Sequence, residues 1–148
     1  MPMTKKRRDF EAKFTTKLQA WLRHNAASIN EIMNVGPIEV KVSYDKRFNL
    51  KQNIKVHQLK FLMAIRNRKT IVYKISDMDR MRKPWDLDCY TNSAPYFVIM
   101  WYRGGNKVFY IIDPIKIEIA MKNGVKSLLE QDAEDMALYI GHLKGKTK

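Results

Sequence analysis

Apolar side chains recur along the chain with two periods, one typical of helices and one typical of strands. Between residues 8 and 25 they are spaced by three and four positions, as on one face of an α-helix. These apolar positions are Phe10, Phe14, Leu18, Trp21 and Leu22. After a turn at residues 34–37, the segment GPIEVKVSY alternates strictly between apolar and polar positions. This alternation predicts a strand over residues 38–44.

A second helix is predicted over residues 50–66, after a basic polar loop at residues 45–50. Its apolar stripe consists of Ile54, Phe61, Leu62 and Ile65. Gln58 falls within this stripe, four residues after Ile54 and four before Leu62. A core-facing amide without a hydrogen-bond partner costs on the order of 1–3 kcal/mol. We therefore expect Gln58 to find a partner in the interior.

The second half of the chain is dominated by strand patterns. Strands are predicted over residues 70–76, 85–90, 96–102 and 108–113, and the continuous apolar run YFVIMWY is typical of a central strand. The segment SLLE, which begins at Ser127, has the form of a capping box and predicts a C-terminal helix over residues 127–145. These elements predict one α/β domain spanning residues 1–148, with a central mixed β-sheet flanked by helices.

The net charge of the chain indicates what kind of partner it binds. The chain carries 28 Lys and Arg against 15 Asp and Glu, a formal net charge of +13. Such an excess indicates a polyanionic partner, with nucleic acid first. We expect the basic clusters to contact DNA phosphates, which positions DNA without reading its sequence. The clusters are Lys5, Lys6, Arg7 and Arg8 in a flexible arm of residues 1–8, then Lys46, Arg47 and Lys51, then Arg80, Arg82 and Lys83.

Other classes of protein are disfavoured by what the chain contains. A single cysteine, Cys89, excludes an intramolecular disulfide and a cysteine-rich zinc site, and favours an intracellular, cytoplasmic setting. No apolar run approaches the roughly 18 residues of a membrane span, and the acidic last helix argues against an anionic membrane surface. No glycine-rich phosphate loop is present, so no small-molecule cofactor is predicted.

Glu39 and Lys41 pose the chemical question, because residues two apart on a strand share one face. They are either a solvated charge pair or a metal ligand with its catalytic lysine. Carboxylates bind Mg²⁺, and a neighbouring lysine can orient the attacking water or stabilise the charge of a phosphodiester transition state. Glu11, on the flank of the first apolar stripe, and Asp86, within a later strand, are further carboxylate candidates.

Taken together, these segments resemble the PD-(D/E)XK nuclease superfamily, especially its Holliday junction resolvase branch. The resemblance rests on a first helix with a Glu, the strand IEVK and the helix VHQLKFL, and it spans residues 10–114. The segments YKISD, KPWDLDCY, YFVIMWY and VFYIID resemble small phage-encoded members. The resemblance implies a restriction-endonuclease-like core. It makes Glu39 the motif acid, Lys41 the motif lysine, Gln58 the helical glutamine and Glu11 the first-helix acid.

The chain departs from the family pattern at one metal ligand. The superfamily usually carries an Asp on the strand just before the E-x-K motif, in a hairpin. Here either Glu31, in the segment SINEIM, substitutes for it, or Asp86 supplies the carboxylate from a neighbouring strand. The segment KPWD favours Asp86 by resemblance. If neither reaches the site, the protein binds DNA without cutting it.

The expected function is hydrolysis of DNA phosphodiester bonds with Mg²⁺ or Mn²⁺, and the resemblance implies branched DNA such as a four-way junction. A symmetric cut requires two active sites, which predicts a homodimer joined through the C-terminal helix or the strand at residues 96–102. One alternative is a non-catalytic DNA-binding or virion-associated protein that retains the nuclease fold. Another is a nuclease for linear or damaged DNA.

Overall fold

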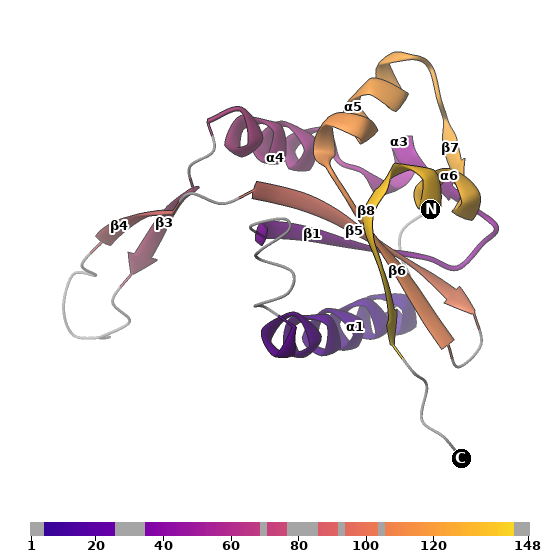
Figure 1. The fold of residues 1–148 in the computed structure, drawn as a ribbon, viewed down its shortest axis with the longest axis horizontal. Helices are drawn as coiled ribbons and strands as arrows, with labels where there is room; N and C mark the ends of the chain where they lie inside the picture. Colours follow the sequence, from indigo (N-terminus) through magenta and orange to yellow (C-terminus); the bar gives the residue numbers. More distant parts are fainter. Residues whose placement is uncertain are drawn as a thin grey trace.

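The computed structural model describes residues 5–25, 35–68, 71–76, 86–91, 94–103 and 106–143 (Figure 1). In chain order the elements are α1 (Lys5–His24), β1 (Val35–Ser43), β2 (Arg47–Asn49), α3 (Leu50–Asn53), α4 (Val56–Arg68), β3 (Ile71–Ser76), β4 (Asp86–Thr91), β5 (Ala94–Arg103), β6 (Asn106–Ile112), α5 (Pro114–Lys122), β7 (Ser127–Leu129), α6 (Glu130–Met136) and β8 (Ala137–Leu143).

The main sheet has four strands in the order β1-β5-β6-β8. Strand β1 is parallel to β5, whereas β5 pairs with β6 and β6 with β8 in antiparallel fashion. A parallel pair needs a crossover connection, which α4 supplies between β1 and β5. The predicted α/β fold with a mixed sheet between helices is confirmed, and so is the central position of β5, where Phe97, Val98, Ile99 and Met100 are fully buried.

Helices cover both faces of this sheet. Figure 1 shows α1 on one face and α4 and α5 on the other. On the α1 face, Phe14 and Leu18 pack into a core with Val98 and Phe109. On the α4 face, the core is formed by residues of several elements, including Leu62, Ile99, Tyr110 and Ile117. None of the helices in the described part of the chain combines the length and the apolarity needed to cross a bilayer.

The second predicted helix is interrupted near Ile54. The α3 turn is capped by the Asn49 side chain, which accepts the Gln52 N–H at 3.0 Å, and α4 begins anew at Val56. Phe61 does not belong to the core, because 58% of it is exposed. Met63 is buried instead, so the buried face of α4 is rotated away from Phe61. The predicted loop at residues 45–50 contains the short strand β2, which pairs with β7.

The predicted C-terminal helix over residues 127–145 is wrong. Ser127 lies in strand β7, and α6 ends at Met136, where β8 begins. The helix start lies after Leu129, whose N–H donates to the Asp132 side chain at 2.7 Å. Gly141 is a buried position of β8 where a Cβ atom would collide with the Phe109 ring.

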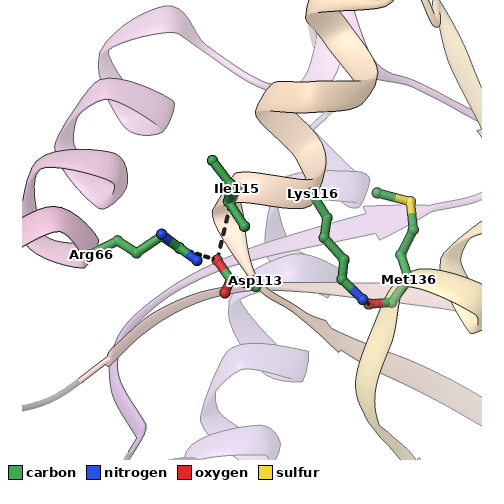
Figure 2. A network of polar contacts seen from close by, with 5 residues as sticks. All are labelled: Arg66, Asp113, Ile115, Lys116 and Met136. Atoms are coloured by element: carbon green, nitrogen blue, oxygen red, sulfur yellow. Dashed lines mark hydrogen bonds and ion pairs between the residues drawn. The ribbon is translucent and has the colours of Figure 1, made fainter.

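Helix α5 was not predicted, and its position depends on polar contacts that Figure 2 shows. The Asp113 side chain accepts the Ile115 N–H at 3.0 Å and caps the helix, while Pro114 occupies the first turn. The same carboxylate accepts from Arg66 of α4 at 2.7 Å. Lys116 donates to the Met136 carbonyl at 3.2 Å, which ties α5 to the end of α6.

Candidate functional site

Strand β1 presents Glu39 and Lys41 on the face of the sheet that α4 covers. The register sets Glu39 beside Phe97 and Lys41 beside Ile99, both of which belong to the core under α4. Because β1 is an edge strand of the described sheet, these two side chains lie between core and solvent. The Lys41 Nζ atom is 3.1 Å from Glu39 Oε1, and only 13% of the Lys41 side chain is exposed.

Gln58 joins this pair from the first turn of α4. Its Oε1 atom accepts the backbone N–H of Lys55, just before the helix, at 3.2 Å. Its Nε2 atom donates to Glu39 Oε1 at 2.6 Å. The helix start therefore fixes which end of the amide faces Glu39. The expectation that Gln58 has a hydrogen-bond partner is confirmed, but the partner lies at the partly exposed edge of the sheet rather than in the interior.

Glu11 approaches from α1, on the other side of the sheet. Burial raises the pKa of the half-buried Glu11 carboxyl, Lys41 lowers that pKa, and Glu39 raises it. These effects couple the three charged groups electrostatically, and α1 packs against β1. Within residues 5–25 and the other described ranges, the Glu11 carboxylate has no hydrogen bond or ion pair of its own.

The site thus combines two carboxylates, one ammonium and one amide. Both donors to Glu39 reach Oε1, so its second oxygen has no partner among the residues that the structure describes. Carboxylate oxygens are the ligands that Mg²⁺ prefers, and this ion keeps several waters, so one or two protein carboxylates are enough. Glu11 and Glu39 are the carboxylates of this site that could supply such ligands. Across the described ranges, no group of three or more His, Cys, Asp or Glu side chains is arranged to hold a metal.

Asp86 is not brought next to Glu39 by strand pairing. It lies at the start of β4, opposite Ser76 of β3, in a separate two-stranded sheet (Figure 1). The strand beside β1 is β5 instead. The side chain of Asp86 and the whole of Glu31 lie outside the described residues, so their roles as metal ligands stay predictions. The described acid on which Glu39 acts electrostatically is Glu11, which the resemblance makes the first-helix acid.

The predicted DNA-binding residues fall into three groups. Lys46, Arg47 and Lys51 are exposed, directly after β1, and Arg47 donates to Ser127 at 3.4 Å. The second group lies in the first turns of α1, which begins at Lys5, within the segment predicted as a flexible arm; this group contains Lys5, Lys6, Arg7 and Arg8. The third group lies outside the described residues; it contains Arg80, Arg82 and Lys83.

An aromatic cluster beside this site was not predicted. We define it as Phe10, Tyr44 and Tyr102, whose rings contact one another. A signal for it exists in the sequence. The alternation of strand 38–44 puts Tyr44 on the face opposite Lys41, toward the helix of Phe10. The contact of Tyr44 with Tyr102 depends on the pairing of β1 with β5. The alternation of apolar and polar residues does not determine which strands pair.

Comparison of the chain with family models, with curated proteins and with solved structures gave no match. The resemblance to PD-(D/E)XK nucleases therefore stays a prediction.

Proposed function

We propose that this protein is a metal-dependent DNA endonuclease whose active site contains Glu11, Glu39, Lys41 and Gln58. One observation carries the proposal. Lys41 and Gln58 converge on a single oxygen of Glu39, at 3.1 and 2.6 Å, and a second carboxylate without a partner among the described residues lies close by. A carboxyl group whose pKa is raised by burial, near a second carboxylate and a lysine, is more typical of a functional site than of a surface ion pair.

Each residue has a definite task in this proposal. Glu39 and Glu11 hold Mg²⁺ or Mn²⁺, which when bound supplies an activated water and neutralises phosphate charge. Lys41 orients the attacking water or stabilises the charge that develops on the scissile phosphate, where a mostly buried ammonium acts more strongly than one in bulk water. Gln58 is a positioning residue, because it fixes the Glu39 carboxylate from the start of α4.

The charge of the chain supports DNA as the substrate. A net charge of +13 favours a phosphate backbone, and exposed Lys46, Arg47 and Lys51 follow the strand that carries Glu39 and Lys41. Phosphates near the cut would meet these residues first. Binding of this kind weakens as salt rises, because each neutralised phosphate releases counterions.

Branched DNA and a homodimer belong to the proposal through the family resemblance. Cutting a four-way junction symmetrically needs two active sites. Strand β5, one candidate for the dimer contact, is paired with β1 and β6 on its two sides, and its exposed side chain among the described residues is Tyr102. The other candidate surface was the C-terminal helix. Its helical part is the seven-residue α6, in which Gln131, Asp132, Glu134 and Asp135 are exposed.

The decisive experiment compares cleavage of a labelled four-way junction with cleavage of a matched linear duplex in Mg²⁺. Lys41→Ala should lower the cleavage rate about 100- to 1,000-fold, the usual cost of removing a group that stabilises transition-state charge. Lys122→Ala is the matched control. It also removes one positive charge, but from an exposed pair with Glu118 on α5, and it should cut like the wild type.

A non-catalytic DNA-binding protein is the second candidate, favoured because the described residues contain no three-ligand metal group. In that case, both wild type and Lys41→Ala bind DNA tightly and neither cuts it. If wild type and Lys41→Ala cut DNA at the same rate, Lys41 has no role in cleavage and is not an active-site residue. Preference for the linear duplex would favour a repair-type or restriction-type nuclease over a resolvase.

A further inference from the structure

The aromatic cluster of Phe10, Tyr44 and Tyr102 forms a partly open apolar surface at the end of the sheet, on the α1 face. The ring centroids of Phe10 and Tyr102 are 5.1 Å apart in an edge-to-face arrangement. Tyr44 lies 5.9 Å from Phe10 and 6.0 Å from Tyr102. Tyr102 is 43% exposed, so part of its ring is accessible to a ligand.

Two lysines adjoin this cluster. Lys107 pairs with Tyr102 in the β5–β6 register, and its Nζ atom lies 5.4 Å from the centre of the Phe10 ring. Burial lowers the pKa of Lys107, and the nearby Lys17 ammonium lowers it further. In the part of the chain that the structure describes, neither lysine has an ion-pair partner. Two neighbouring ammonium groups without a carboxylate favour an external anion.

The cluster is close to the proposed active site. Phe10 immediately precedes Glu11 on α1, and Tyr44 follows Lys41 by three residues, on the order of 10 Å along a strand. Glu39 and Lys41 point to one face of β1, whereas Tyr44 points to the other. Since β1 is an edge strand in the described sheet, a polymer that crosses this edge meets both faces.

We propose that the aromatic cluster and the lysines Lys17 and Lys107 together bind an unpaired nucleotide of the DNA substrate. The base stacks on the exposed Tyr102 ring and its phosphate lies against the two ammonium groups. The proposal rests on the proposed nuclease function and deepens it, because it names DNA with unpaired bases next to the cut as the substrate class.

Ring stacking and positive charge together favour a nucleotide over an apolar protein segment. Aromatic rings bind bases of any sequence because every base has a flat face, and neighbouring cations track the backbone. Bases inside an intact duplex are already stacked on one another and offer no free face. An apolar protein partner would leave Lys17 and Lys107 without an anion beside the interface.

Fluorescence of a single-stranded oligonucleotide that contains 2-aminopurine tests this inference. The titration is done in EDTA, so that no cleavage occurs, and the duplex of the same sequence is titrated in parallel. Stacking should change the emission of the base. Tyr102→Ala should weaken binding of the single strand about 5- to 100-fold, and binding of the duplex by less than about twofold.

Two variants serve as matched controls. Tyr102→Phe keeps the ring and should bind the single strand like the wild type. Phe61→Ala removes another exposed ring, 58% exposed, from α4 on the opposite face of the sheet, and should also bind like the wild type. Circular dichroism of each variant establishes that the fold is retained. Lys107→Gln keeps the ring and should reduce the salt dependence of log K by about 0.7, the contribution of one phosphate contact.

Unchanged single-strand binding in Tyr102→Ala would overturn the inference, as would an equal loss of single-strand and duplex binding. If Lys107→Gln left the salt dependence of binding unchanged, the proposed contact between Lys107 and a phosphate would be wrong. These outcomes are separate from the nuclease proposal. If the base stacks as expected but the protein never cuts DNA, only the nuclease proposal is overturned. If the protein cuts DNA but Tyr102→Ala does not change single-strand binding, only the stacking site is overturned.

Discussion

Two ion pairs lie on the α4 side of the sheet, and they are built differently. In the first pair, Arg66 Nε meets Asp113 Oδ1 at 2.7 Å, and the same oxygen accepts the Ile115 N–H at 3.0 Å (Figure 2). One cation faces one anion, and the anion also caps α5. Each of these contacts joins one element to another, so the pair has a complete structural explanation.

The second pair, Lys41 and Glu39, is accompanied by a further carboxylate, that of Glu11. Gln58 adds a second donor to Glu39, but the Glu11 carboxylate beside them has no partner among the described residues. One ammonium thus faces two half-buried acids, in a chain whose net charge is +13. A fold that needed only a salt bridge would gain nothing from Glu11. The carboxylate that the fold leaves without a partner is therefore the one to consider for a ligand.

Asp113→Ala should have the largest effect on stability, because it removes a helix cap and the partner of Arg66 at once. We expect the free energy of unfolding to fall by about 2 kcal/mol, of which the cap accounts for about 1 kcal/mol. Asp113→Asn, which keeps a capping oxygen, should recover about half. Urea denaturation measures both. Cleavage by Asp113→Ala below its melting range should stay near wild type; a specific loss of cutting would place this pair in the active site.

Gln58→Glu should have a smaller and pH-dependent effect. The new side chain still accepts the Lys55 N–H, but it places a carboxylate where an amide donated to Glu39 at 2.6 Å. Like charges raise the pKa of such a pair, so the folded state holds an extra proton and loses stability as pH rises through that pKa. We expect a loss of about 1 kcal/mol at pH 7 that shrinks on acidification.

Gln58→Ala separates this charge effect from simple loss of contacts. It removes the cap acceptor and the donor to Glu39, so its melting temperature should be lowered by a similar amount at every pH. Thermal melts of both variants between pH 4 and 8 make the comparison. Parallel curves for Gln58→Glu and Gln58→Ala would show that Gln58 acts only through the helix start.

The residues of the site that were predictable are those fixed by local geometry. Glu39 and Lys41 share a face because of strand alternation, and Gln58 faces inward because of its place between Ile54 and Leu62. Helix α1 and strand β5 were likewise evident from the spacing of apolar residues. In each case the signal lies within one element, and burial of one face is enough to determine which side chains point inward.

The parts that were missed depend on contacts between distant segments. The pairing of β2 with β7 and of β6 with β8 joins strands far apart in sequence, and periodicity over 127–145 favoured a helix. Position 141 of β8 requires glycine, because the Phe109 ring lies where a Cβ atom would be. Similarly, alternation identified the strand of Asp86 but not its partner, which is β3. The effect of Glu39 and Lys41 on Glu11 depends on the packing of α1 against β1, which the spacing of apolar residues does not determine.

Glu11→Gln should have the smallest effect and the most informative one. Burial raises the folded-state pKa of Glu11 above its usual value of 4.5, so between these two values the folded protein holds more protons than the unfolded chain. Stability is therefore lost as pH rises through this window. Below pH 4.5 the wild type and Glu11→Gln should melt at similar temperatures, and above the folded-state pKa Glu11→Gln should melt higher.

Magnesium ions should reverse this order at neutral pH. An ion held by Glu11 and Glu39 binds only the folded protein and raises its melting temperature with concentration. The wild type should thus gain more from Mg²⁺ than Glu11→Gln does, whereas Asp113→Asn, altered at the satisfied pair, should gain as much as the wild type. Equal gains in all three proteins would mean that the surplus carboxylate holds no metal, and Glu11 would then be merely a buried acid that costs stability.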